Sequence, residues 1–297
     1  MNMTVTTQED SLLFAAAEVQ YMQAAYQRAV SSLTNYIAQY CAGGRYCTTA
    51  RYYLADSYYR LGKTTEALKE YKQLAELAAN PYQEEAAIRV AEISYDKGDW
   101  TGALEAFYRM NSLASTRENI NIARLGILRC SYQLQRHQAT IDIAEQILSD
   151  TPVDEDVRRE AMYNRAKAYV AQKQWTKAQN DLHSLASEVR TAQGAEAKYL
   201  LAQSYFELGQ PDEAESEVMS FTQMNTQQQY WLARALILLS DINLRRGENF
   251  QARQYLLALQ QNYMQQGDDI QQIVSERLAA IDALERPVKN EETEEED

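Results

Sequence analysis

The sequence predicts an all-α fold made of about seven pairs of short helices, and two recurring spacings support this prediction. Turn residues recur every 36 to 38 positions along the 297-residue chain. A small residue stands five positions after almost every turn, and another stands seven positions before most turns. Closely packed helices need small side chains at their contact, so the spacings indicate paired helices in a repeat array. The turn residues are Ala24, Gly62, Gly98, Gln135, Lys173, Gly209 and Gly247.

Each repeat is expected to contain a first helix before its turn and a second helix after it. In the clearest copy the small residues are Ala55 and Ala67, on either side of Gly62. Larger apolar residues follow nine and twelve positions after the turn, here Tyr71 and Leu74, and this spacing places both on one helical face. Proline stands where three of the helices would begin, at Pro81, Pro152 and Pro211.

The two ends of the chain differ from the repeats. Residues 1–10 are expected to form a flexible N-terminus, and residues 11–286 to form the helical array with its end helix. An amphipathic segment over residues 269–284 predicts that end helix, because a repeat array needs a cap on its open apolar end. After Pro287 the chain has six acids, one lysine and no apolar face, so residues 287–297 are expected to be a disordered acidic tail.

The second repeat resembles the tetratricopeptide repeat (TPR) motif. The residues that match the motif are Leu54, Ala55, Tyr58, Gly62, Ala67 and Tyr71. The turn signature recurs over residues 98–103 and 209–214, and the resemblance covers roughly residues 11–263. It implies a right-handed superhelical solenoid of about seven TPR helix pairs plus a C-terminal capping helix.

A narrower resemblance concerns the cellular compartment. Residues 194–205 and 230–235 are similar to the C-terminal part of long exported TPR proteins of Gram-negative bacteria, in the style of the Tol-Pal coordinator and the outer-membrane assembly lipoprotein. Residues 1–10 lack the basic and apolar regions of a secretion signal. The chain is therefore expected to be cytoplasmic, or a piece of an exported protein of the periplasm or cell envelope. The resemblance favours the envelope.

Composition and motifs exclude several function classes. The formal net charge of −13 disfavours nucleic acid as a partner, because binding to phosphate needs clustered Lys and Arg. No stretch approaches the roughly 20 apolar residues of a membrane-spanning helix. The chain lacks phosphate-binding glycine loops and nucleophile motifs, so we expect no enzyme activity and no cofactor. His137 and His183 are isolated from each other, which argues against a metal site.

The three cysteines leave two interpretations open. Cys41 and Cys47 flank a turn-like segment between the first two repeats. In an oxidising compartment they could form a disulfide, and otherwise they are two small residues in a loop between repeats. Cys130 is expected to be a packing residue of a first helix.

The TPR resemblance implies that the first helices line a groove, at positions ten, six and three before each turn. Nine of the fourteen residues at positions ten and three before the turns are aromatic, so we expect a tyrosine-rich stripe. An alternative is that about half of these rings pack against the adjacent helix and show only an edge to solvent. The predicted partner-binding residues are Tyr52, Asp56, Tyr59, Glu92, Tyr95, Arg129, Tyr132, Tyr163, Lys167, Tyr199 and Phe206.

Charges at the middle position change sign along the predicted groove. Glu18, Asp56 and Glu92 make the first three repeats acidic, whereas Arg129 and Lys167 make the next two basic. A ligand with a basic segment followed by an acidic one would fit, although an ordinary solvated face explains the same pattern. The acidic end also excludes the carboxylate clamp of chaperone-docking TPR proteins from the first three repeats.

These observations predict a non-enzymatic scaffold or adaptor that binds an extended peptide or protein segment in its groove. The identity of that protein or peptide partner is beyond the sequence. The alternative is a structural spacer or self-assembling segment of a longer TPR protein, without its own ligand. Leu12, Phe14 and Val19 on the first helix favour an exposed stacking face, and through such repeat ends the chain could also form a homo-oligomer.

Overall fold

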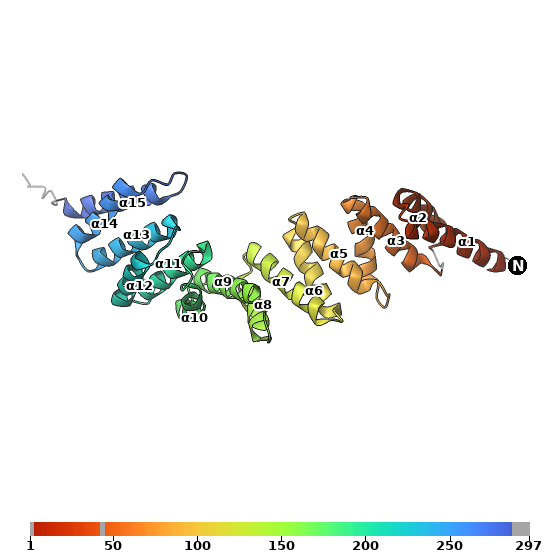
Figure 1. Cartoon of the computed structure of the whole chain (residues 1–297), viewed down its shortest axis with the longest axis horizontal. Coiled ribbons are helices and arrows are strands. Elements are labelled where there is room, and N and C mark those ends of the chain that lie inside the picture. The colour runs from red at the N-terminus through yellow and green to blue at the C-terminus, as the bar shows by residue number, and fades with distance from the viewer. Residues whose placement is uncertain (1–2, 42–44, 287–297) are drawn as a thin grey trace, which may run out of the picture. The chain divides into compact units, whose positions relative to one another are not determined.

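A computed structural model describes residues 3–41 and 45–286 (Figure 1). Over these residues every regular element is an α-helix, and none of these helices is long and apolar enough to cross a membrane. The helices are α1 (Met3–Met22), α2 (Tyr26–Tyr40), α3 (Cys47–Arg60), α4 (Thr64–Glu76), α5 (Gln83–Asp96), α6 (Trp100–Leu113), α7 (Arg117–Gln133), α8 (His137–Ser149), α9 (Glu155–Ala171), α10 (Trp175–Leu185), α11 (Ala192–Glu207), α12 (Pro211–Gln223), α13 (Gln229–Arg245), α14 (Asn249–Asn262) and α15 (Ile270–Glu285).

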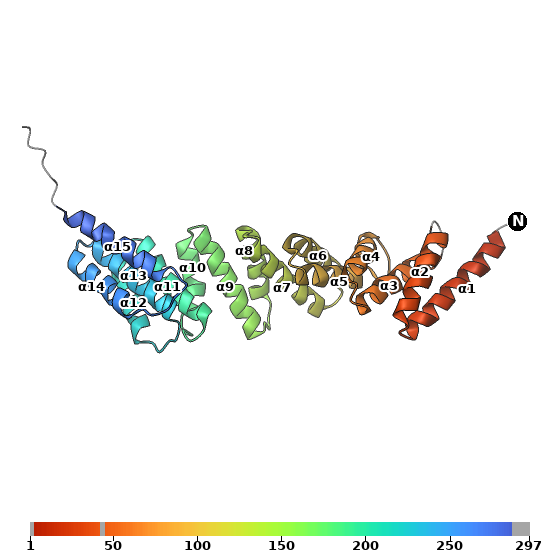
Figure 2. The ribbon, with the colours of Figure 1, turned by 90° about the horizontal axis from the view of Figure 1, so that it is seen from above.

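The helices form two compact units. The N-terminal unit, Met1–Val153, contains α1 to α8, and the C-terminal unit, Asp154–Asp297, contains α9 to α15. Within each unit, consecutive helices form hairpins, and each hairpin packs against the next one along the chain (Figure 2). Helices α1 to α14 thus form the seven predicted pairs, numbered here as repeats 1 to 7, and the all-α prediction is confirmed.

The turn register is confirmed at all seven repeats. Each predicted turn residue has a positive φ, between 53° at Gln135 and 78° at Gly247. At Gly62 the backbone N–H donates to the carbonyl of Tyr59, and the next N–H, that of Lys63, donates to the carbonyl of Tyr58. This pattern closes a helix through a left-handed residue, and it recurs at the other six turns.

The core lies between the helices of each hairpin and between neighbouring hairpins of one unit. Ala55 and Ala67, the small residues around the second turn, are fully buried. The larger residues nine and twelve positions after each turn are buried in every repeat, for example Tyr71 and Leu74. Helix α15 buries Ile270, Val274 and Ile281 and caps the C-terminal unit as predicted.

The N-terminal boundary differs from the prediction. Helix α1 begins at Met3, so most of residues 1–10 is helical and not the flexible segment expected from the sequence. Part of the reason is tertiary: Asp10 is buried and accepts a hydrogen bond from the Tyr36 hydroxyl of α2. Sequence periodicity does not reveal such a contact between helices. The predicted acidic tail, residues 287–297, lies outside the described residues.

Candidate protein-binding groove

Three of the four aromatic residues ten positions before the turn stack on a ring of the following repeat. Phe14 stacks on Tyr46, with ring centroids 4.6 Å apart and planes within 4°. Tyr52 stacks on Tyr82 in the same way at 4.2 Å, and the Tyr82 hydroxyl donates to Thr49 at 3.3 Å. The partner ring stands sixteen positions before the next turn in both cases. These rings therefore join successive repeats.

The C-terminal unit repeats this contact. Tyr199 stacks on Trp231, which also stands sixteen positions before its turn, with centroids 5.7 Å apart. The guanidinium of Arg234 lies 5.4 Å from the centre of the Tyr199 ring and donates to its hydroxyl at 3.3 Å. Tyr199 is 7% exposed, so most of this predicted groove residue is covered.

Rings three positions before the turn also contact neighbouring side chains. The Tyr59 ring lies under the Arg89 guanidinium at 5.1 Å, across one repeat boundary. Tyr95 instead packs within its own repeat, edge-on to Trp100 at 5.1 Å and to Phe107 at 6.2 Å. These side chains are half-buried, as the alternative interpretation of the stripe expects for about half of them.

Asp56 is an internal acceptor, although the sequence placed it in the groove. Its side chain is buried, with 4% of the residue exposed. It accepts hydrogen bonds from Tyr21 at 2.9 Å and from Tyr71 and Arg60 at 3.4 Å each. Burial, followed by this hydrogen bond, raises the pKa of Tyr21 well above its ordinary value. The carboxylate thus joins α1, α3 and α4 in the N-terminal unit.

The predicted charges of the middle repeats have partners within the fold. Glu92 accepts from Arg89 at 2.9 Å. Lys167 forms an ion pair with buried Glu196, which also accepts from the Tyr163 hydroxyl at 2.6 Å. Arg129 and Tyr132 lie half-buried on α7. A ligand would have to compete with the partners of Glu92 and Lys167, so the charge pattern alone does not define a ligand.

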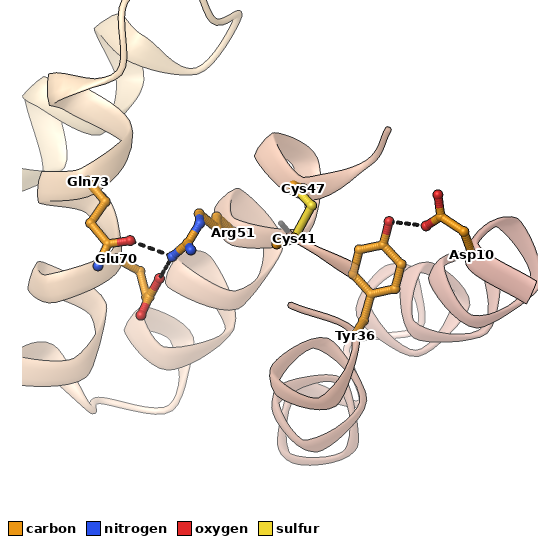
Figure 3. Close-up of a disulfide and its surroundings, with 7 residues drawn as sticks. All are labelled: Asp10, Tyr36, Cys41, Cys47, Arg51, Glu70 and Gln73. Carbon is orange, nitrogen blue, oxygen red and sulfur yellow. Dashed lines mark hydrogen bonds and ion pairs between the residues drawn. A yellow bond between two sulfur atoms is a disulfide. The ribbon is translucent and has the colours of Figure 1, made fainter. Parts of the chain in front are cut away.

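A disulfide links the first two repeats. It joins Cys41 at the end of α2 to Cys47 at the start of α3, with Cα atoms 5.3 Å apart (Figure 3). Of the two interpretations left open by the sequence, the structure has the paired one. Cys130 is a free, fully buried thiol, and burial raises its pKa to about 11.

A cavity opens along the first helices of the C-terminal unit. Its volume is about 360 Å³, and residues of α11, α13 and α15 line it. Five lining residues occupy the predicted groove positions: Tyr199, Gln203, Phe206, Ile237 and Asp241. The remaining lining residues are Glu207, Arg234, Leu238, Ile273, Glu276 and Arg277.

The cavity combines apolar walls with charges of both signs. Arg277 donates to both oxygens of Asp241, at 2.8 and 3.3 Å, so these two charges largely neutralise each other. Phe206 is covered on one face by the Arg245 guanidinium, 3.7 Å from the ring centre. Glu207 and Glu276 are exposed at the rim. An entering side chain therefore meets isoleucine and phenylalanine side chains, the Arg234 guanidinium and two exposed carboxylates.

The predicted partner-binding residues included only Tyr199 and Phe206 of this cavity, although Gln203, Ile237 and Asp241 also stand at groove positions. Glu276 and Arg277 were missed because the end helix was treated only as a cap, and Arg234 of α13 was missed because it stands thirteen positions before its turn, outside the three groove positions. Reading α15 as the first helix of a further repeat would have brought its residues to the groove. No group of His, Cys, Asp and Glu side chains in residues 3–41 and 45–286 is arranged to hold a metal ion.

Comparison with known families agrees with the helix-pair geometry. The family model described as tetratricopeptide repeat matches residues 14–84, 52–116 and 163–220, which together exceed half of the chain. The chain belongs to the tetratricopeptide repeat family. TPR proteins generally act as protein-binding scaffolds, and this chain carries the repeat on which that property depends. A comparison with curated proteins gives no match.

Several solved structures resemble this TPR chain in fold. A chain of the Naa15/Naa10 structure bound to HypK-THB matches at a TM-score of 0.54 and 14% identity, over 93% of this chain and 41% of that chain. A tetratricopeptide repeat protein from Parabacteroides merdae matches at a TM-score of 0.41 and 17% identity, over 92% and 99%. The type IV pilus biogenesis factor PilW matches at 0.45 and 21%, over 77% and 98%. At these identities the likeness concerns the fold alone.

Proposed function

We propose that this TPR chain is a non-enzymatic scaffold that binds an extended peptide or protein segment along its first helices. The cavity between α11, α13 and α15 is the anchoring site. The observation that carries the proposal is its position, because it opens at residues ten, six and three before the turns. A volume of about 360 Å³ accommodates one or two side chains of a bound segment.

The lining favours a particular kind of segment. Ile237 and Ile273 give an apolar wall, and the ring of Phe206 completes it. The rim acids Glu207 and Glu276 are solvated, whereas the inner charge of Asp241 is satisfied by Arg277. A segment with an apolar side chain beside a Lys or Arg therefore matches both the wall and the rim.

The test starts from a library of random peptides displayed on phage and selected on the immobilised chain. Selected peptides are synthesised, and their Kd is measured by fluorescence anisotropy. We expect enrichment of an apolar residue next to a basic one. Changing Glu276→Lys should weaken binding about tenfold, or ~1.4 kcal/mol, because it reverses a rim charge.

A matched control uses the same substitution outside the cavity. Glu213→Lys changes an exposed glutamate in the first turn of α12, which does not line the cavity, and should leave the Kd unchanged. Thermal melting of both variants checks that the fold is intact. Equal effects of the two substitutions, or the selection of no peptide, would contradict the cavity as a binding site.

A structural role for the N-terminal unit is the second candidate. There the rings of Phe14 and Tyr52 stack on the following repeat, and the Asp56 carboxylate already accepts hydrogen bonds from side chains of the same unit. This favours a spacer that positions a binding unit, with no ligand on α1 to α6. A selected peptide whose affinity falls on Tyr95→Ala, without loss of stability, would exclude this second reading.

We also propose that the chain works in an oxidising compartment, such as the periplasm. The Cys41–Cys47 disulfide supports this, because reducing compartments keep cysteine thiols reduced and unpaired. The test is acid-quenched alkylation of cells that express the natural protein, followed by a gel shift. Two of the three cysteines should be protected until a reductant is added. Alkylation of Cys41 and Cys47 before reduction would contradict the proposal.

A further inference from the structure

The first helix carries an exposed apolar face. Leu12 is 71% exposed, Val19 52% and Met22 65%, and the exposed residues Ala15 and Ala16 lie between them. The spacing of three, four and three residues places this face along one side of α1. On the opposite side, α1 already packs on its neighbours.

Later repeats show what this side of a first helix normally contacts. The residues twelve and eight positions before the turn are buried in α3, α5, α7, α11 and α13, each of which follows another hairpin of its own unit. The residue nine positions before the turn, next to the second of these, touches the preceding hairpin directly: Tyr53 stacks on Tyr21 at 4.1 Å, and Arg89 lies over Tyr59. Leu12 and Ala16 occupy the same two positions in α1 and are exposed. Within the described residues, α1 has no preceding hairpin.

The α1 face is not shaped like the later ones. Twelve positions before the turn, the five later helices all have a buried alanine: Ala50, Ala86, Ala123, Ala197 and Ala235. Eight positions before the turn they have a buried branched residue: Leu54, Val90, Ile127, Leu201 and Leu239. In α1 the sizes are exchanged, with Leu12 at the first position and Ala16 at the second. A preceding hairpin shaped like the later ones would clash with Leu12 and leave a cavity at Ala16.

We propose that this face binds a second copy of the chain, α1 against α1, in an antiparallel arrangement about a two-fold axis. A two-fold contact requires a face that is complementary to itself. Leu12 and Val19 stand at equal distances on either side of Ala15 and Ala16. Antiparallel pairing then sets each Leu12 against Val19 of the second copy, twice, and the small alanines meet at the crossing point, where the helices approach closest.

Charge selects the antiparallel direction. The face itself has no charged residue, so the net charge of −13 does not oppose contact there. Glu9 is exposed one turn before Leu12, and Arg28 is exposed beyond the other end of the apolar face, at the start of α2. Arg28 stands four positions after its turn, like Gly102, which faces the preceding helix α4 across a small cavity. Antiparallel pairing brings Glu9 of one copy near Arg28 of the other, whereas parallel pairing brings like charges together.

The test measures the mass of the full chain by sedimentation equilibrium, over roughly 1 to 100 μM. We expect a monomer–dimer equilibrium in this range, since a single helix face gives a smaller interface than a permanent dimer. Leu12→Glu and Val19→Glu should each weaken the dimer at least tenfold, because each places two charges in the apolar contact. Phe250→Glu is the matched control, since Phe250 on α14 is 73% exposed and apolar, and it should leave the dimer unchanged.

Cross-linking tests the two-fold geometry. Ala16→Cys should form an intermolecular disulfide with itself under mild oxidation, because the two positions meet at the axis. Leu12→Cys alone should not, because its two copies lie about 10 Å apart along the helix, beyond the roughly 7 Å between Cα atoms that a disulfide spans. Mixing Leu12→Cys with Val19→Cys should restore cross-linking. A chain that stays monomeric at the highest concentration, or a dimer insensitive to both glutamate substitutions, would overturn the proposal and leave this face to a different polypeptide.

Discussion

Removal of the Asp56 carboxylate should destabilise the N-terminal unit without any ligand being present. In Asp56→Ala, the hydroxyls of Tyr21 and Tyr71 lose their acceptor inside the packed repeats. A hydrogen bond to a charged group contributes about 1.5–3 kcal/mol, and we assign the upper end of this range to the 2.9 Å bond from Tyr21. The bond from Tyr71 is longer, and Arg60 is 55% exposed, so these two add little. We expect a total loss of about 3 kcal/mol.

The assay is urea unfolding of the full chain, followed by far-UV circular dichroism, with hydrogen exchange to locate the loss. Exchange should accelerate in α1, α3 and α4, the helices that the carboxylate joins. A double-mutant cycle with Tyr21→Phe should give a coupling above about 1 kcal/mol. Asp96→Ala, an exposed aspartate at the end of α5, is the control and should change almost nothing. A loss below about 0.5 kcal/mol, or no coupling, would refute the internal role of Asp56 and favour its predicted role as a partner-binding residue.

Two further predictions concern backbone conformation and pH. Gly62→Ala should cost about 1–2 kcal/mol because Gly62 has φ 73° and a Cβ there would meet nothing within 4 Å, so the cost is conformational alone. Gln135→Gly, at φ 53°, should not destabilise, and equal losses at both sites in urea unfolding would contradict this account. Burial, followed by the hydrogen bond to Glu18, raises the pKa of Tyr53 to about 12. Because the folded pKa is raised, this stabilisation is complete below pH 10 and is lost as the pH rises toward 12. An absorbance titration compared with Tyr53→Phe should show the late ionisation, and Glu18→Gln should move it earlier; an ordinary midpoint near 10 in the folded chain would contradict the assignment.

The sequence could predict the hairpins because their signals are local. A turn with a left-handed residue closes one helix and starts the next within a few positions, and glycine marks four of the seven turns. Gln135 and Lys173 carry no such mark, yet the spacing alone located them. In each case the repeat supplies the missing information, since the same contact must recur at the same interval.

The role of the aromatic stripe could not be predicted in the same way. The side chain ten positions before the turn lies on the groove side of its helix, but the residues that it contacts there belong to the next repeat. Tyr52 is half-buried and stacks on Tyr82, whereas Ile237 is buried and lines the cavity beside α15. Nothing within one repeat distinguishes the two. Asp56 is a similar case, because its acceptor role depends on donors from α1 and α4 that lie 35 and 15 residues away.

This dependence on the neighbouring repeat decides which substitutions can assign a function. Tyr199 contributes both to the cavity and to the contact with Trp231, so a loss of binding in Tyr199→Ala would mix a lost ligand contact with a loosened repeat boundary. Glu276 is exposed at the cavity rim and takes no part in that stacking. The same stacking also holds the cavity wall in place before a ligand arrives, which lowers the ordering cost of binding. Substitutions of the rim charges, and not of the groove aromatics, therefore distinguish a peptide-binding scaffold from a structural spacer.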